Sequence, residues 1–117
     1  MKLLFTLILL CAGLFANTLQ EIRNSGVIRV GVRDGRPPFS EISGGKFEGF
    51  EIELANAIAK AIFGAKQGEV QFVSLSAVDR VSYLVNNKVD MVVATFVIDS
   101  ARKNHVDFST PYFSTNL

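Results

Sequence analysis

Residues 51–63 read EIELANAIAKAIF, and the apolar residues of this stretch recur three or four positions apart. That spacing places them on one face of an α-helix, as in a helix that packs against a core. The face consists of Ile52, Ala55, Ala59 and Ile62, widened by Leu54 and Ile58. Gly64 and Gly68 follow, so we expect the helix to end at residue 63.

Apolar strands precede and follow this helix in the sequence. Residues 27–32 (VIRVGV), 70–73 (VQFV) and 89–94 (VDMVVA) are rich in β-branched residues, which favour strands. The third is almost continuously apolar, which is typical of a strand buried on both faces. A helix over residues 76–86, capped by Ser76, separates the second and third strands. Strands that alternate with helices predict the α/β class, with a mostly parallel sheet flanked by helices.

Shorter elements complete the prediction. We expect a helix over residues 18–24, strands over residues 39–42 and 106–109, and a short helix after Asp99. Residues 33–38 (RDGRPP) have the composition of a loop, which the two prolines make stiff.

The predicted sheet brings three loops to one edge. Ligands of parallel sheets bind beyond the carboxyl ends of the strands, which here means after Val32, Val73 and Ala94. The segments that follow these strands all carry arginine: Arg33 and Arg36, Arg80, and Arg102. A guanidinium binds a carboxylate through two parallel hydrogen bonds, so this edge is a candidate anion site. Each arginine also has a simpler interpretation, as a charged residue of a loop or a solvated surface.

Arg102 lies three residues after Asp99, in the first turn of the predicted short helix. A cation there opposes the helix dipole at a cost of about 0.3–1 kcal/mol, and a bound anion would reverse the sign of that effect. Unpaired amide groups at the helix start would add donors for the same anion. The alternative is an exposed arginine paired with Asp99, and the residues alone leave both interpretations open.

Other residues at this edge also have two interpretations. Thr95 follows the third strand beside Ala94, and its carbonyl is a candidate acceptor for a ligand ammonium group. Phe39 and Phe50 either line a pocket or belong to the core.

The amino-terminal residues differ in composition from the rest. Lys2 precedes a short and almost wholly apolar run, and a small residue follows at Ala16. The run is shorter than the roughly 20 residues that span a bilayer, so we predict a cleaved signal peptide over residues 1–16. A buried core helix is one alternative. Lipid attachment at Cys11 is another, disfavoured because Leu10 is larger than the residue that such a signal requires.

Charge and composition exclude several classes of function. Removal of Lys2 takes one member from the 12 Lys and Arg residues, which then equal the 11 Asp and Glu residues in number. This balance argues against nucleic acid and anionic membrane as partners. Removal of Cys11 leaves no cysteine, and His105 is the single histidine. Disulfides and thiolate sites are therefore excluded, and a histidine metal site is disfavoured.

No arrangement of catalytic residues is visible. The sequence has neither a glycine-rich phosphate loop nor a nucleophile with an evident base partner. Glu51 and Glu53 are two positions apart on a helix, so they do not face each other as a carboxylate pair. We therefore expect a binding protein without a cofactor.

Several stretches form a recognisable combination. They are residues 49–54 (GFEIEL) with Ile58, Ala59 and Ile62, residues 25–32 (SGVIRVGV), residues 37–39 (PPF), residues 87–90 (NKVD), and Arg102-Lys103 followed by residues 106–109 (VDFS) and Pro111-Tyr112. Together they resemble the bacterial extracellular solute-binding proteins of the polar amino-acid type, family 3, over residues 19–117.

This resemblance implies a two-lobed α/β fold that closes on one amino acid and delivers it to the membrane permease of an ABC transporter. It places the family's carboxylate-binding arginine on Arg102 and a backbone contact to the ligand near Thr95. Arg33 and Arg80 together resemble the branch that binds acidic amino acids.

The sequence departs from the family pattern at two positions. Val97 stands where many members have a threonine, and Ala77 where many have an aromatic residue, so a hydrogen bond and a stacking contact are absent from the expected site.

Members of the family are longer than this chain. We therefore expect residues 17–117 to be part of the N-terminal lobe of a monomeric periplasmic protein, and to bind amino acids weakly without the second lobe. An enzyme on the same fold, of the dehydratase or murein-cleaving kind, and the sensor domain of a receptor are the alternatives.

Overall fold

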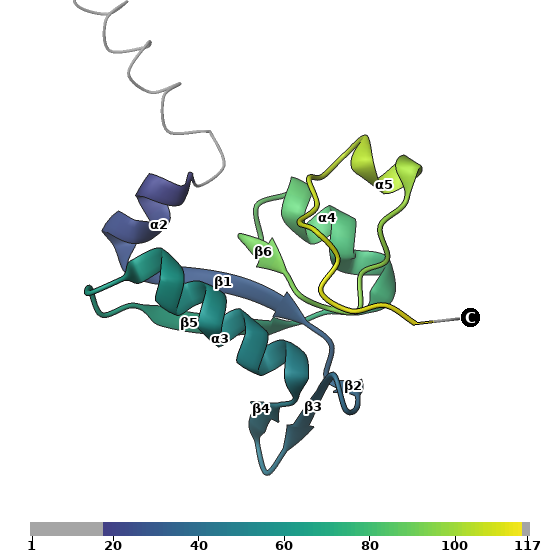
Figure 1. Ribbon diagram of the computed structural model, residues 1–117, viewed down its shortest axis with the longest axis horizontal. Helices are drawn as coiled ribbons and strands as arrows, with labels where there is room; N and C mark the ends of the chain where they lie inside the picture. Colours follow the sequence, from purple (N-terminus) through teal and green to yellow (C-terminus); the bar gives the residue numbers. More distant parts are fainter. Residues whose placement is uncertain (1–17, 116–117) are drawn as a thin grey trace, which may run out of the picture.

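A three-stranded parallel sheet in the order β5-β1-β6 forms the centre of the computed structural model, which describes residues 18–115 (Figure 1). β1 (Val27–Val32) pairs along its whole length with β5 (Glu69–Ser74). On its other side β1 pairs with β6 (Met91–Val92). The predicted α/β class and parallel sheet are confirmed, while the predicted signal peptide lies outside the described residues.

The first described helix begins and ends at residues suited to those positions. α2 (Leu19–Ser25) is capped by Thr18, whose hydroxyl accepts a hydrogen bond from the amide of Glu21, and it ends at Gly26 with a φ of 74°. This left-handed conformation is the common end of a helix and costs glycine little. The other helices are α3 (Phe50–Phe63), α4 (Arg80–Val85) and α5 (Ser100–Lys103).

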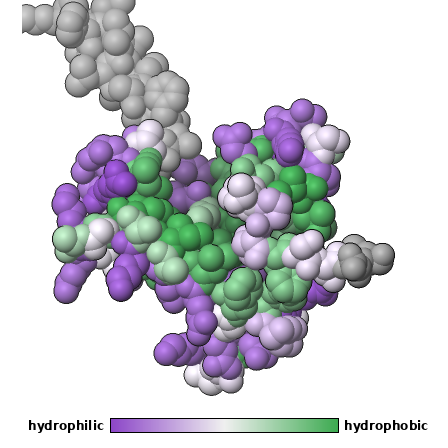
Figure 2. Space-filling model, viewed as in Figure 1, coloured by the Kyte–Doolittle hydropathy of each residue, from purple (hydrophilic) through white to green (hydrophobic). Residues whose placement is uncertain are grey.

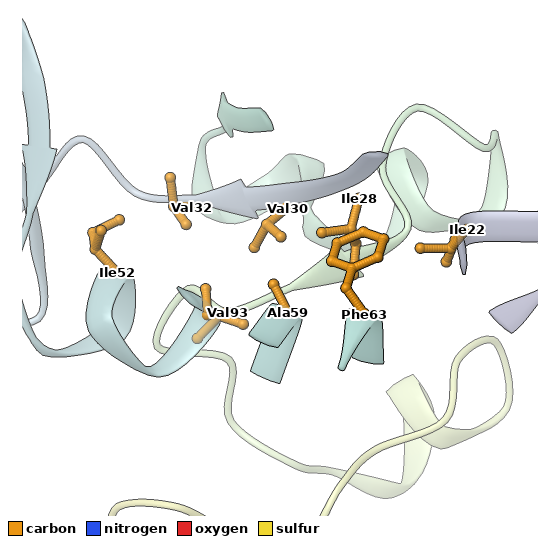
Figure 3. Close-up of a cluster of buried hydrophobic side chains, with 9 residues drawn as sticks. Ile22, Ile28, Val30, Val32, Ile52, Ala59, Phe63 and Val93 are labelled. Atoms are coloured by element: carbon orange, nitrogen blue, oxygen red, sulfur yellow. The ribbon is translucent and has the colours of Figure 1, made fainter. Parts of the chain in front are cut away.

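The core lies between the sheet and α3, where the predicted apolar face of the helix meets β1. Figure 3 shows side chains of β1 that point toward α3, with Phe63 closing the end nearest α2. The buried cluster consists of Ile22, Ile28, Val30, Val32, Ile52, Ala55, Ala59, Phe63 and Val93. In the view of Figure 2, apolar side chains gather over the middle of the molecule and hydrophilic ones occupy much of the rim.

A small antiparallel sheet connects β1 to α3. β2 (Gly35–Arg36), β3 (Ser40–Ser43) and β4 (Lys46–Glu48) pair in sequence order, so β2 and β4 are strands that the sequence analysis missed. Gly49 then leads into α3 with a φ of 128°, and a Cβ atom there would lie 2.5 Å from the carbonyl oxygen of Phe39. A glycine is therefore required where the hairpin meets the helix.

The predicted helix over residues 76–86 and the last predicted strand differ from the structure. The helix over residues 76–86 is divided into a 3₁₀ turn (Ala77–Asp79) and α4. The predicted strand over residues 106–109 is wrong, because this segment joins neither sheet. Phe108 of this segment packs instead against Phe96, with ring centroids 5.1 Å apart.

The third predicted strand is shorter than expected. The amides of Asp90 and Val93 donate to β1 carbonyls at 2.9 Å each, but regular pairing is limited to Met91–Val92. Thr95 then adopts a left-handed backbone with a φ of 46°, which turns the chain away from the sheet. Among residues 18–115, no helix combines the length and the apolar character needed to cross a membrane.

Candidate functional site

The carboxyl ends of the three parallel strands meet at one edge of the sheet, as predicted. β1, β5 and β6 run in the same direction, so the segments after Val32, Ser74 and Val92 begin at this edge. A hydrogen bond of 2.8 Å from Ser74 Oγ to Asp34 Oδ2 joins the last residue of β5 to the segment after β1. The edge is thus built from parts of the chain that are distant in sequence.

Arg80 is buried at this edge, with 8% of its surface exposed. Its Nε donates to the carbonyl of Ala77 at 2.9 Å, and its Nη1 donates to the carbonyls of Ala94 at 3.1 Å and Thr95 at 2.8 Å. The guanidinium therefore fastens the turn after β6 to the start of α4. Its Nη2 donates to none of the residues that the structure describes, which leaves donors for a ligand.

Charged groups of both signs surround Arg80. Burial, followed by the charges of Arg102 and Arg33, lowers the pKa of Arg80 from its usual value, whereas Glu51 and Tyr112 act in the opposite direction. The charges of Arg102 and Arg33 thus both act on Arg80. An anion bound beside Arg80 would offset this repulsion, so a carboxylate suits this edge.

Phe96 brings two of these arginines to one ring. The Cζ atom of Arg80 lies 4.7 Å from the ring centroid and that of Arg102 lies 4.9 Å from it. Guanidinium groups at such distances are attracted to the ring's negative face. Phe96 follows Thr95 directly, so the turn after β6 determines where both cations stand.

Arg102 is half-buried and holds its own loop. Its Nη1 donates to the carbonyl of Val97 at 2.6 Å, and its Nε lies 3.4 Å from Asp99 Oδ2. Asp99 Oδ1 accepts the backbone amide of Arg102 at 2.7 Å, so the predicted Asp99 cap is confirmed. Asp99 therefore takes the amide of Arg102, and the single-turn α5 has only a small dipole. The predicted role of the other amides at the start of this helix stays a prediction.

The remaining predicted site residues lie at different places around the edge. Ala94 is fully buried and half-buried Thr95 follows it, and both of their carbonyls accept from Arg80. Arg33 is half-buried, and its charge reaches Arg80. The ring of Phe39 packs edge-on against Phe113, 5.0 Å away, in an aromatic cluster. The roles of these residues in binding stay predictions.

The aromatic cluster continues beyond Phe39. Phe50 lies 6.4 Å from the ring of Phe39 and 6.1 Å from that of Tyr112, although 43% of Phe50 is exposed. Both rings therefore pack in an aromatic cluster, and Phe50 lies at the surface rather than in the core.

Glu51 belongs to this edge, although the sequence analysis did not select it. Its side chain is fully buried in the first turn of α3. Its Oε2 accepts the amide of Thr95 at 2.7 Å and also the hydroxyl of Tyr112. A signal was present in the sequence, because Glu51 precedes Ala55 and Ala59 by one and two helical repeats of four and so lies on the buried face.

Tyr112 responds to this environment. Burial, followed by the hydrogen bond to Glu51 and the charge of that carboxylate, raises the pKa of the Tyr112 hydroxyl well above its usual value of 10.0. The phenol therefore stays protonated and donates to Glu51 at neutral pH.

Other chemistry has less support. The described part of the chain contains no group of three or more His, Cys, Asp or Glu side chains placed to hold a metal ion. A hollow of about 750 Å³ is lined by Ile98, Lys103, Val106, Asp107, Phe108, Ser109 and Pro111, and none of the predicted site residues is in this lining. The placement of Arg80 and Arg102 on the ring of Phe96 is what favours a small anion-bearing ligand at the arginine edge.

Known proteins resemble this chain in sequence. The family profile described as bacterial extracellular solute-binding proteins, family 3, matches residues 28–117. The glutamine-binding protein of a Bacillus subtilis ABC transporter is 37% identical over 99 residues, which cover 83% of this chain and 36% of that protein. The chain thus spans little more than a third of the length of such relatives.

Solved structures resemble it as well. A cysteine-binding protein from Campylobacter jejuni has a TM-score of 0.76 at 42% identity, covering 82% of this chain and 39% of that one. Domain 1 of the arginine-binding protein TmArgBP, solved as a point mutant in its arginine-bound form, has a TM-score of 0.74 at 30% identity. That match covers 82% of this chain and 72% of the domain.

Proposed function

Because this chain belongs to the bacterial extracellular solute-binding proteins, family 3, we propose that it captures a polar amino acid for an ABC importer. The observation that carries the proposal is the arrangement of Arg80 and Arg102 against the ring of Phe96, with Arg33 within electrostatic reach. An amino acid brings the carboxylate that such a group of cations requires.

Within this proposal, Arg102 binds the α-carboxylate. It is the more exposed of the two arginines on Phe96, and its Nη2 donates in none of the hydrogen bonds among the described residues. The carbonyl of Thr95 retains a second lone pair beside its bond from Arg80, which suits the ligand ammonium group.

We propose an acidic or otherwise polar side chain for the ligand. Three guanidinium groups exceed what one α-carboxylate needs, and Arg33 and Arg80 suit a second carboxylate. The relatives named above bind glutamine, cysteine and arginine. These ligands support the proposal of a polar amino acid, whether or not its side chain is acidic.

The cellular setting follows from the same proposal. Residues 1–16 serve as a signal peptide, the protein acts as a monomer in the periplasm, and its macromolecular partner is the membrane permease of the transporter. Residues 17–117 contribute part of the first lobe, and a second lobe would close over the ligand. The glutamine-binding relatives from Geobacillus stearothermophilus and Bacillus subtilis are binding proteins, and we propose no catalytic step.

Calorimetric titration of the full-length gene product tests this function. The panel consists of glutamate, aspartate, glutamine, cysteine, cystine, arginine and histidine. Replacement of Arg102 by alanine should weaken binding about 100-fold, which corresponds to about 3 kcal/mol for a charged pair of hydrogen bonds.

The neighbouring Lys103→Ala variant is the matched control, because Lys103 is exposed on the same short helix. It should bind within about twofold of the unaltered protein, the size of a minor surface effect. Equal affinity of the Arg102→Ala variant and the unaltered protein would refute the assignment of Arg102. The absence of binding to the whole panel would refute the proposed function. A lack of preference for glutamate or aspartate would remove only the acidic specificity.

A further inference from the structure

The buried carboxylate of Glu51 at the arginine edge belongs neither to the apolar core nor to the proposed ligand contacts. The carboxylate of Glu51 is fully buried, yet it faces polar groups from two segments distant in sequence. Its Oε1 has no hydrogen-bond partner among residues 18–115. A buried acid at this position requires a reason, because desolvation of a carboxylate is costly.

The partner of Glu51 is a strained turn. Thr95 has a φ of 46°, a conformation that β-branched residues rarely adopt. Glu51 Oε2 accepts the amide of Thr95 at 2.7 Å, and Arg80 Nη1 donates to its carbonyl at 2.8 Å. Oppositely charged side chains therefore hold the two polar backbone groups of one residue. This clamp fixes the turn in a conformation that its own side chain disfavours.

The turn carries the proposed ligand contacts. Thr95 precedes Phe96, whose ring holds the guanidinium groups of Arg80 and Arg102. A change in the backbone of Thr95 would rotate Phe96 and displace both cations. Glu51 itself lies beneath the turn and is fully buried, so it does not contact the ligand directly.

Glu51 also joins the turn to a third segment. The hydroxyl of Tyr112 donates to the same Oε2 atom that accepts the amide of Thr95. The carboxylate thus links α3, the turn after β6 and the segment after α5.

We propose that Glu51 is a positioning residue of the amino-acid site, which fixes the turn at Thr95 so that Phe96 and its two arginines stand ready for the ligand. The inference rests on the proposed function for the identity of the ligand. The clamp on Thr95 is a property of this chain that is measurable without any ligand.

The binding experiment compares four versions of the full-length gene product. Glu51→Ala removes the acceptor and should weaken binding of the best amino acid of the panel at least tenfold. Glu51→Gln should bind within about threefold of the unaltered protein, because its carbonyl can stay at the Oε2 position while its amide replaces the unpartnered Oε1. Glu53→Ala is the matched control, since it removes an exposed carboxylate two positions along the same helix and should leave affinity unchanged.

A rescue experiment separates positioning from general destabilisation. Glycine adopts positive φ without strain, so Thr95→Gly should recover several-fold of the affinity lost in Glu51→Ala while giving no gain in the unaltered protein. A purely structural role would lower the stability of Glu51→Ala but leave its folded molecules with normal affinity. Normal affinity in folded Glu51→Ala, equal losses in the alanine and glutamine variants, or no rescue by Thr95→Gly would each overturn the proposal.

Hydrogen exchange supplies a measurement that needs neither a ligand nor a folded alanine variant. The amide of Thr95 should exchange as slowly as the amides of β1 in the unaltered protein and in Glu53→Ala. Rapid exchange of this amide in the unaltered protein would overturn the clamp. Slow exchange together with no binding to the panel would refute the proposed function and leave the clamp on Thr95 supported.

Discussion

Replacement of Arg80 by methionine removes the guanidinium that ties the turn after β6 to the start of α4. Methionine preserves much of the side-chain volume but has no hydrogen-bond donor. The carbonyls of Ala77, Ala94 and Thr95 lose the donors that reach them at 2.9, 3.1 and 2.8 Å. The Phe96 ring also loses a cation 4.7 Å from its centroid.

The magnitude follows from burial and from the number of acceptors. A buried carbonyl left without a partner costs about 1–3 kcal/mol, and water reaches the half-buried Thr95 more readily than Ala94. Ala77 is exposed, so water replaces its lost donor, while the losses at Ala94 and Thr95 share one side chain and are not additive. We therefore expect the free energy of unfolding to fall by about 2–4 kcal/mol. Relief of the repulsion from Arg102 and Arg33 acts in the opposite direction and places the result toward the lower end.

Urea unfolding followed by far-ultraviolet circular dichroism measures this loss. Arg80→Lys should lose less stability than Arg80→Met, because an ammonium group retains charge and donors but lacks the planar fork. Arg36→Met is the control, since Arg36 is exposed on β2 and should change stability by less than about 0.5 kcal/mol. A loss below about 1 kcal/mol in Arg80→Met would contradict the role of Arg80 as the anchor of this turn.

Three further variants test other parts of the structure. Gly49→Ala should lower the free energy of unfolding by about 2–4 kcal/mol, since its Cβ would lie 2.5 Å from the Phe39 oxygen at a φ of 128°. Gly35→Ala, with open space around it, should cost under about 1 kcal/mol, and equal effects in urea unfolding would contradict the close approach. Asp90→Asn should lower the free energy of unfolding by about 2–3 kcal/mol, because the Asp90 side chain, 2% exposed, pairs with Arg29 at 2.7 Å. The control Asp107→Asn changes an exposed residue and should leave stability unchanged. An Asp90→Asn variant of unchanged stability would count against this ion pair. The folded state binds the Tyr112 proton more tightly than the unfolded state, because the pKa of this hydroxyl is raised on folding. The contribution of this hydroxyl to the free energy of unfolding should therefore be fully present below pH 10.0 and decrease as the pH rises above it. Tyr112→Phe should lose this alkaline dependence in unfolding experiments, and an unchanged dependence would exclude Tyr112 as its source.

The sequence predicted the elements whose apolar pattern is regular and local. β1 and α3 each present a run with a clear period, so their positions were predicted to within one residue. The edge that gathers Arg33, Arg80 and Arg102 followed from strand direction alone. Positions that depend on one specific tertiary contact were not predicted.

The missed features have physical reasons. The strand expected over residues 106–109 has a suitable composition, but Phe108 packs against Phe96 and the segment joins neither sheet. Glu51 was dismissed because Glu53 cannot face it, whereas its partners are the amide of Thr95 and the hydroxyl of Tyr112, neither of which local spacing reveals. The left-handed backbone of Thr95 is likewise imposed by neighbours, because nothing in its own chemistry favours it.

The central position of β1 has a consequence for how the chain folds. Parallel neighbours cannot form through a tight hairpin, so Val27 must find Glu69 and Val30 must find Met91 across long intervening segments. Closure of such loops costs entropy before contacts compensate for it, which slows the search. We expect α3 with β1 and β5 to assemble first. β6 pairs through only two residues, so we expect it to join the sheet last. The arginine edge would then be the last part of the lobe to reach its native structure during refolding.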